Sequence, residues 1–289
     1  MFSYCGHQQI AQFRTFGFVV LRALFSPHEV GALRHEVVAA LTDAYGELGV
    51  TPIPSGGGIS GQYLPLSADR APLSQALIAD DPRLFQGAAA LLGRPVVPTV
   101  PIATCFTSNA AWHTDDGTGI GGVKFLAHLE ARSANDGALL LIPGSQQPSF
   151  AGSVQDYLAS DPARQGFPGW PVPCVAAETQ PGDVIAFDVR VFHASVGGQQ
   201  RLAWSIEYVP WPGLRDPGRL RRLRDTVNDI VDYRHLGYDQ ERWPIWRDWV
   251  AGAAGRRSRQ VAVDRLRLLG VLDKVGQERG REPGESAGR

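Results

Sequence analysis

Apolar residues at two different spacings mark the first part of the chain. Residues 18–21 form a compact apolar run, which predicts a strand entering a core. Apolar side chains then recur at helical spacing, at Val30, Leu33, Val37, Val38 and Leu41. Ser26, Pro27 and Glu29 stand where a helix N-cap, a first position and a capping-box acid belong. The stretch 7–47 therefore predicts a short helix, a strand and a longer helix.

Between about residues 101 and 209 the pattern changes to short β-type runs. The runs are 102–107, 123–130, 138–142, 174–179, 184–188 and 202–208. Two of the separators, Asn-Asp-Gly at 135–137 and Gln-Pro-Gly-Asp at 180–183, are strong turn signals. Many short strands with such separators predict an antiparallel sandwich or jelly roll.

Helical patterns flank this β-region on both sides. They cover 73–93 and, after Pro210, roughly 217–235, 239–251 and 257–272. No internal repeat is present, so we expect a single domain over residues 1–289. Its parts would be a helical N-terminal portion (7–95), a β-core (about 100–210), a helical C-terminal extension (211–275) and a polar, Gly-rich tail (276–289) that we expect to be disordered.

Two irregular segments are candidates for substrate contact. Residues 52–66 are rich in Gly, Pro and Ser, and residues 148–172 lie in a long insertion with several Pro, Gly and aromatic residues. Such loops often carry binding residues on a rigid scaffold. We expect both segments to form a lid over the β-core, with Gln62 and Tyr63 contacting substrate.

Composition narrows the class of partner. The chain has 289 residues, is 44% hydrophobic and carries a formal net charge of −1. This balance offers no electrostatic footprint for nucleic acid or an anionic membrane, and no apolar run reaches the length of a membrane span. No secretory signal is visible, and the three cysteines, Cys5, Cys105 and Cys174, are far apart, which disfavours disulfides. We therefore expect a cytoplasmic monomer or homodimer whose partner is a small molecule.

Three residues carry the strongest chemical signal. His113 and Asp115 stand two apart, so on a strand or at its end both side chains point the same way. His193 sits at a later strand end. Two imidazoles and one carboxylate on one face of a metal leave the opposite positions open, as is typical of non-haem Fe(II) oxygenases. Arg201 then offers a guanidinium fork that pairs well with a carboxylate.

Longer stretches around these residues resemble one family. Residues 135–146 (NDGALLLIPGSQ) resemble the NGxLxxxPGSH stretch of the phytanoyl-CoA dioxygenase (PhyH-like) family. Residues 181–188 (PGDVIAFD) resemble the family's xPGDxxxFD lead into its distal histidine. Residues 13–34 look like its opening helix, strand and helix. The resemblance covers roughly residues 8–210.

The resemblance implies both a fold and a set of site residues. The fold would be a double-stranded β-helix (jelly roll, cupin-like), mainly β with helices at both ends. The implied iron ligands, which form the catalytic centre, are His113, Asp115 and His193. Arg201 would bind 2-oxoglutarate, and Ser195, at the family's HxS position, would hydrogen-bond the same carboxylate. Gln146 replaces the family's usual histidine outside the metal set, and the presence of Asp115 argues against the halogenating branch, where a small residue replaces this carboxylate.

The implied activity is a dioxygenase that uses Fe(II), 2-oxoglutarate and O2, with ascorbate as a supporting reductant. It would hydroxylate an unactivated C–H bond of a small molecule, or desaturate it or oxidise it to a ketone. The near-neutral charge and the lack of a basic cluster give no obvious site for a CoA pyrophosphate. We therefore expect a natural product or modified metabolite as substrate, as in antibiotic biosynthesis.

The run that begins at Val123 adds further candidates. Its alternation puts Lys124, Leu126 and His128 on one face. Only Lys124 and Lys274 are lysines in this chain, so a lysine in mid-strand is unexpected. We hypothesise that Lys124 and Leu126 line the cosubstrate site and that Lys124 contacts the cosubstrate or an anionic group of the substrate. His128 and Trp204 are further candidate substrate contacts.

Less specific interpretations stay open at this point. They are a surface pair of His113 and Asp115, Asp116 as the ligand in place of its neighbour, Lys124 as a solvated edge-strand charge, Ser195 as a turn cap, and Trp204 as a core residue. Two other classes of protein also fit: a cupin-type metal enzyme that does not use 2-oxoglutarate, and a non-catalytic binding protein that kept the barrel.

Overall fold

Two antiparallel β-sheets lie face to face in the computed structural model, which describes residues 5–49, 61–66, 71–116, 119–160, 172–231 and 247–272. The larger sheet has the order β1 (Phe18–Leu21), β9 (Val184–Asp188), β6 (Val123–His128), β11 (Arg201–Pro210), β4 (Ile102–Phe106) and β2 (Gly61–Pro65), and β3 (Val96–Pro98) also pairs with β11. The smaller sheet has the order β5 (Ala110–His113), β10 (His193–Ser195), β7 (Leu139–Leu141) and β8 (Val175–Ala177). Buried apolar side chains of both sheets, such as Leu141 and Ile185, form one cluster between them. These facing sheets confirm the predicted jelly roll.

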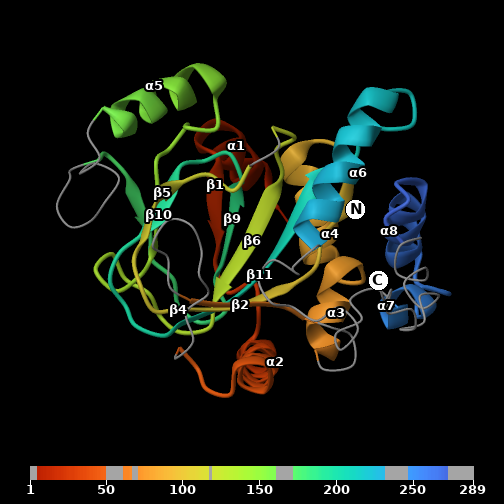
Figure 1. Cartoon of the computed structure of the whole chain (residues 1–289), viewed down its shortest axis with the longest axis horizontal. Helices are drawn as coiled ribbons and strands as arrows, with labels where there is room; N and C mark the ends of the chain where they lie inside the picture. The colour runs from red at the N-terminus through yellow and green to blue at the C-terminus, as the bar shows by residue number, and fades with distance from the viewer. Residues whose placement is uncertain are drawn as a thin grey trace, which may run out of the picture.

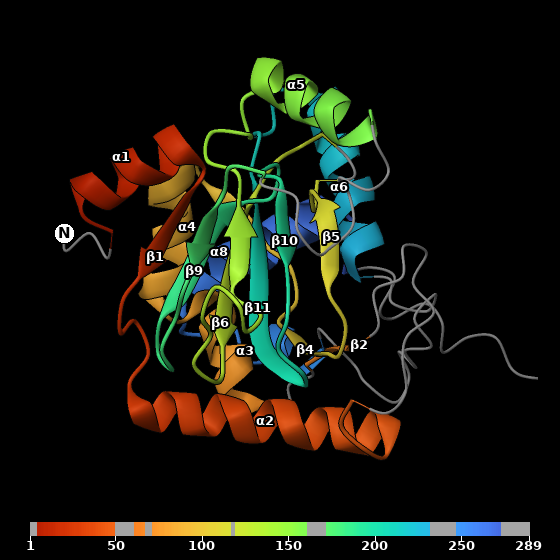
Figure 2. The same cartoon turned by 90° about the vertical axis from the view of Figure 1, so that its left-hand side faces the viewer.

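Helices cover the outer face and the ends of the larger sheet. They are α1 (His7–Phe16), α2 (Pro27–Tyr45), α3 (Pro72–Ala79), α4 (Pro82–Leu92), α5 (Pro148–Ala159), α6 (Pro217–Val231), α7 (Arg247–Ala251) and α8 (Arg257–Leu268). In Figure 1, α4, α6 and α8 lie on the side of the larger sheet that faces away from β5 and β10. Figure 2 shows α2 running below the strands and α5 at the opposite end. The helices therefore leave the space between the two sheets to side chains from the strands.

The N-terminal elements confirm the prediction for 7–47 and show why it held. Gly17 takes a left-handed φ of 83° between α1 and β1, a conformation that suits glycine. Ser26 caps α2 by accepting a hydrogen bond from the Glu29 backbone, and the Glu29 side chain accepts one from the Ser26 backbone. The predicted helix 73–93 is instead two helices, because Asp81 caps a new start and Pro82 follows it.

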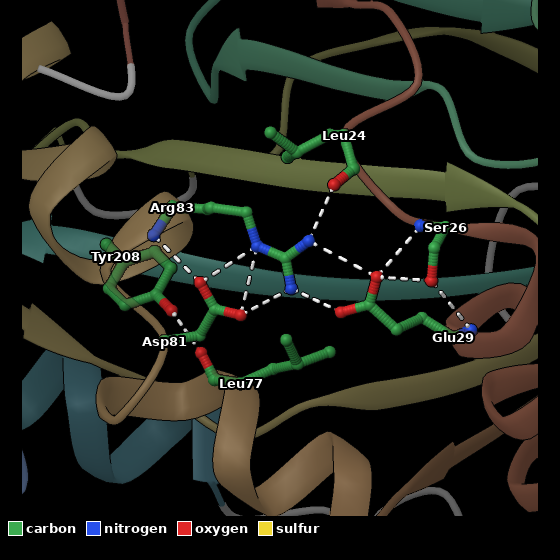
Figure 3. A network of polar contacts seen from close by, with 7 residues as sticks. All are labelled: Leu24, Ser26, Glu29, Leu77, Asp81, Arg83 and Tyr208. Atoms are coloured by element: carbon green, nitrogen blue, oxygen red, sulfur yellow. Dashed lines mark hydrogen bonds and ion pairs between the residues drawn. The ribbon is translucent and has the colours of Figure 1, made fainter. Parts of the chain in front are cut away.

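A network of polar contacts joins the starts of α2 and α4 (Figure 3). The guanidinium of Arg83 donates to the carboxylates of Glu29 and Asp81 and to the Leu24 carbonyl. The hydrogen bond from Arg83, together with contacts from Ser26, lowers the pKa of Glu29 to about 2 although burial opposes the shift. All three nitrogens of the Arg83 guanidinium therefore donate to acceptors within the protein.

Several strands were missed by the hydrophobic pattern, and one predicted loop was wrong in part. Residues 61–65 were expected to be loop, but they form β2, which pairs with β4 at the edge of the larger sheet. β3, β5 and β10 have three or four residues each, too few for a periodic signal. The predicted insertion contains α5, which begins at Pro148. Residues 51–60, 161–171, 232–246 and 273–289, including the expected lid tips and tail, lie outside the described residues.

Candidate metal centre

Two paired strand ends and the bend after one of them bring three potential metal ligands together. His113 ends β5, His193 begins β10, and the two residues are direct partners in the antiparallel register. Their ring centroids are 4.2 Å apart. One carboxylate oxygen of Asp115, Oδ1, lies 3.6 Å from Nε2 of each imidazole. One ligand atom from each residue lies within 4.8 Å of the others, so a single ion can reach all three.

Backbone carbonyls orient both imidazoles. His113 Nδ1 lies 2.7 Å from the Ala111 carbonyl oxygen, and His193 Nδ1 lies 2.9 Å from that of Val191. A carbonyl oxygen only accepts, so each Nδ1 carries the proton and each Nε2 presents its lone pair toward Asp115. Such a contact fixes the tautomer that a metal-binding histidine needs. The backbone N–H of Asp115 donates to the Val189 carbonyl at 2.8 Å, which anchors the bend.

The electrostatics of the cluster favour an ionised Asp115 beside a neutral His113. Burial would raise the pKa of Asp115, but Lys124 and His193 outweigh it and hold that pKa well below its ordinary value. Burial, and then the neighbouring His193, lower the pKa of His113. Lys124 donates to Oδ2 of Asp115 at 2.9 Å. Burial would lower the pKa of Lys124, yet Asp115 raises it, so this lysine stays charged.

The three residues open into a cavity of about 300 Å³ between the sheets. Its lining comprises Gly61, Tyr63, Thr104, Phe106, Ala110, His113, Asp115, Lys124, Leu126, His128, Gly137, Leu139, Phe187, His193, Ala194, Ser195, Arg201, Ala203 and Ser205. Nine of the residues predicted from the sequence for this site line the cavity, and Tyr63 is one of them. β6 is an interior strand of the larger sheet, so the interpretation of Lys124 as an edge-strand charge is wrong.

Arg201 lies buried at one part of this cavity, and its hydrogen-bond partners among the described residues are all neutral. Its guanidinium donates to the Ser195 hydroxyl at 2.7 Å, to the Gly197 carbonyl at 3.2 Å and to the Ser108 carbonyl. Its Nε is buried and has no partner among the described residues. Burial, and then the positive charge of Arg132, lower the pKa of Arg201. A buried guanidinium without a carboxylate partner in the described chain suits an anionic ligand.

Gly137 makes room for this arginine. Its φ is 76°, which side-chain-bearing residues rarely adopt, and a Cβ there would overlap Cδ of Arg201. The glycine belongs to the turn that was predicted from Asn-Asp-Gly at 135–137.

His128 lies in the same cavity as a neutral group. Its Nδ1 is 3.0 Å from the Thr179 hydroxyl. Burial, and then the charges of Arg132 and Arg201, lower the pKa of His128 to about 3. His128 therefore remains uncharged at physiological pH and can offer a hydrogen bond without adding charge.

Two residues that we expected to contact substrate do not line the cavity. The Gln62 side chain donates to the Glu47 carbonyl and accepts from the Gly49 N–H at 3.0 Å. The Trp204 ring donates to the Ser74 hydroxyl at 3.0 Å and packs edge-on against Phe25. Successive residues of a strand face opposite sides, so neither shares the face of its cavity-lining neighbours. Trp204 is the core residue that the alternative interpretation described.

The same alternation identifies residues that the sequence reasoning missed. Ala203 and Ser205 share a face with Arg201 on β11, and Thr104 pairs with Ala203 from β4. Ala203 and Ser205 could have been identified from the sequence, because they lie two and four residues after Arg201 on one strand. The pairing with Thr104 required the register of the sheet. Asp116, the competing carboxylate, instead accepts hydrogen bonds from the Gly119 and Gly121 backbones. No other group of three metal-binding side chains occurs in the described part of the chain, and none of its helices could span a membrane.

Comparison with known proteins agrees with this geometry. The family profile described as "Phytanoyl-CoA dioxygenase (PhyH)" matches residues 13–201. No curated protein matches the chain. Among solved structures, EctD from S. alaskensis is 22% identical with a TM-score of 0.53, over 72% of this chain and 78% of EctD.

Two further solved structures are similar to the chain. AviO1 from Streptomyces viridochromogenes is 22% identical with a TM-score of 0.54, over 75% of this chain and 100% of AviO1. The non-haem, α-ketoglutarate-dependent carbocyclase SnoK from nogalamycin biosynthesis is 19% identical with a TM-score of 0.54, over 75% of this chain and 90% of SnoK. At such identities these likenesses establish the shared fold.

Proposed function

The chain belongs to the phytanoyl-CoA dioxygenase family, and from that premise we propose that it is an Fe(II)- and 2-oxoglutarate-dependent oxygenase acting on a small molecule. One observation carries the proposal. A cluster of two imidazoles and one carboxylate shares a cavity with a buried arginine that has no carboxylate partner among the described residues. A cupin-type enzyme without 2-oxoglutarate has no use for that arginine.

The donor set fits ferrous iron. Two imidazoles and one carboxylate match the facial arrangement of non-haem Fe(II) oxygenases. His113 and His193 present Nε2, and Asp115 presents Oδ1. Iron held there would, with 2-oxoglutarate and O2, supply the oxidising power to convert 2-oxoglutarate to succinate and CO2 and to place one oxygen atom in a substrate C–H bond.

The residues around Arg201 fit the far carboxylate of 2-oxoglutarate. Arg201 supplies a charge-assisted donor, and Ser195, 2.7 Å from it, adds a hydroxyl on the same side. His128 adds an uncharged imidazole nearby. These groups would fix one end of the cosubstrate, so that its other end lies toward the three metal ligands. The family pairing of Arg201 with Ser195 thus remains our proposal for this chain.

The remaining cavity residues would exclude water and limit the substrate's movement. Leu126, Leu139 and Phe187 present apolar surface, and the Phe187 ring lies 5.0 Å from that of His193. An apolar wall near the reacting carbon prevents side reactions with solvent. Tyr63 also lines the cavity, and we propose it as a substrate contact.

We propose a natural product or modified metabolite as the substrate. Solved structures of this fold include EctD with 2-oxoglutarate and 5-hydroxyectoine, and SnoK from nogalamycin biosynthesis. The net charge of −1 gives no reason to favour a CoA thioester. The expected outcome is hydroxylation, with desaturation or oxidation to a ketone as variants that depend on how the substrate is held.

Anaerobic titration of the metal-free protein with Fe(II) and 2-oxoglutarate tests the proposal. We expect the weak visible charge-transfer band of the iron chelate, and succinate release when O2 and a substrate are added. Asp115→Asn should lose the band, whereas Asp116→Asn, the matched control on the neighbouring carboxylate, should keep it. A wild-type protein that binds Fe(II) without developing the band on adding 2-oxoglutarate would favour the cupin-type alternative.

A further inference from the structure

Lys124 occupies a position that its charge alone does not explain. It lies on the interior strand β6, between β9 and β11, where Phe187 and Glu207 are its register partners. Its side chain is only 20% exposed. A lysine ordered in mid-sheet loses much rotamer freedom, so a specific contact must offset that cost. Its ammonium group donates a hydrogen bond to Oδ2 of Asp115 at 2.9 Å.

The two oxygens of Asp115 face different partners. Oδ1 lies 3.6 Å from Nε2 of His113 and equally far from Nε2 of His193. Oδ2 accepts the hydrogen bond from Lys124. The carboxylate is therefore oriented with one oxygen on the metal side and the other on the lysine side.

We propose that Lys124 is a positioning residue that holds Asp115 as a one-oxygen ligand, by retaining Oδ2 on its ammonium group and leaving only Oδ1 to the metal. The inference rests on the proposed function for the identity of the metal as iron. It differs from our expectation that Lys124 would contact the cosubstrate or substrate directly.

A count of donor atoms shows why this matters. Three protein atoms on an octahedral ion leave three positions, which a chelating 2-oxoglutarate and O2 would fill. A carboxylate that turned to offer both oxygens would take one of these positions. Groups that contact a metal ligand from behind commonly fix its orientation in this way. Lys124 therefore protects the open positions without touching the ligands that fill them.

The first test uses the lysine content of the chain. Lys274→Arg leaves Lys124 as the sole lysine, so protein grown on [13Cε]lysine gives one assignable lysine signal in NMR. We expect Zn(II) alone to shift this signal in step with metal binding, and 2-oxoglutarate alone to leave it in place. A signal that ignores saturating Zn(II), or that moves with 2-oxoglutarate in metal-free protein, would overturn the proposal.

The second test compares Lys124→Met with Lys124→Arg. In Lys124→Met, Fe(II) should bind at least as tightly as in wild type, because both oxygens become available. The affinity of the Fe(II)-loaded protein for 2-oxoglutarate should fall by about tenfold to a hundredfold, read from the charge-transfer band. Lys124→Arg keeps a cation on Oδ2 and should recover most of the loss. Unchanged 2-oxoglutarate affinity in Lys124→Met contradicts the proposal.

The two proposals fail in different ways. If the wild type shows no band with Fe(II) and 2-oxoglutarate, the oxygenase assignment fails. The Zn(II) titration of the labelled lysine still decides whether Lys124 responds to a metal on Asp115. It also needs no substitution at Lys124, so it holds even if the Met variant does not fold.

Discussion

Arg83 and Arg201 show two opposite uses of an arginine that the fold takes out of water. Arg83 meets the carboxylates of Glu29 and Asp81, and these two contacts raise its pKa (Figure 3). Arg201 meets two carbonyls and a hydroxyl, and its pKa is lowered by burial. Carboxylates of the chain balance the charge of Arg83. No carboxylate partner among the described residues balances the charge of Arg201.

The difference distinguishes an arginine that stabilises the fold from one that is suited to bind an anionic ligand. An arginine paired with two carboxylates strengthens the junction of two helices and gains nothing from a small anion. An arginine held by neutral groups is oriented, but its charge is not compensated. The carboxylate of an incoming ligand can therefore pair with it. The contrast is tested by measuring both folding stability and 2-oxoglutarate affinity in a variant of each arginine.

The largest effect is expected from Arg201→Ala. Loss of the charge-assisted contact should weaken 2-oxoglutarate binding to the Fe(II)-loaded protein by about a hundredfold to a thousandfold, on the order of 3–4 kcal/mol. The melting temperature without ligand should change little, because no carboxylate of the described chain loses its partner. Titration of the charge-transfer band measures the first quantity and calorimetry the second. A large drop in unliganded stability would show that Arg201 is structural as well.

Arg83→Met should give the reverse result. It leaves Glu29 and Asp81 without their shared cation, and removing one partner of a partly buried ion pair costs about 1–2 kcal/mol of unfolding free energy, less than for a fully buried pair. Urea denaturation measures this loss. The affinity for 2-oxoglutarate should stay within about twofold of wild type by comparison with typical distant substitutions. A variant with wild-type stability would break the contrast.

A pH series sharpens the same comparison at Glu29. The pKa of Glu29 is lowered from 4.5 to about 2, so its ionised form stabilises the fold. This contribution is complete above the unfolded pKa and is lost as the pH falls from about 5 toward 2. The melting temperature of wild type should therefore exceed that of Glu29→Gln at neutral pH and approach it in acid. A gap that stays constant across this range would contradict the assignment.

The smallest effect is expected from Ser195→Ala. Removing one hydroxyl that contacts Arg201 should weaken 2-oxoglutarate binding by roughly threefold to tenfold, in keeping with about 1 kcal/mol for a hydrogen bond. Ser205→Ala serves as the control, because Ser205 lines the same cavity but is not among the described hydrogen-bond partners of Arg201. Equal losses in both variants would mean that Ser195 has no special role in holding the cosubstrate.

The sequence predicted the metal cluster because its members lie close to strand ends, where short-range spacing has direct geometric meaning. His113 and Asp115 are two apart, and Asn-Asp-Gly and Pro-Gly-Asp mark the turns that return the chain to the same place. The jelly roll followed from the same alternation of short runs and turns. The spacing of His113 and Asp115 and the turns follow local backbone rules, which a single sequence displays. The convergence of His193 with them is a long-range pairing, which was supported by the resemblance to the PhyH-like family.

Other parts of the site depend on pairings between distant strands, which a single sequence does not display. The carbonyls of Ser108 and Gly197 that hold Arg201 come from segments without a pattern of their own. Gln62 and Tyr63 were both placed at the substrate, yet neighbours on a strand face opposite sides and only Tyr63 lines the cavity. Recognising 61–65 as a strand would have excluded one of them.

Gly137 extends the meaning of the turn that contains it. Even a methyl group at position 137 would collide with the Cδ methylene of Arg201. The glycine backbone therefore limits where the arginine side chain can lie and how far its guanidinium extends into the cavity. Engineering for a shorter or longer dicarboxylic acid could therefore begin at this glycine behind the arginine, and any enlargement of position 137 should tilt the arginine before it disturbs the three metal-binding side chains.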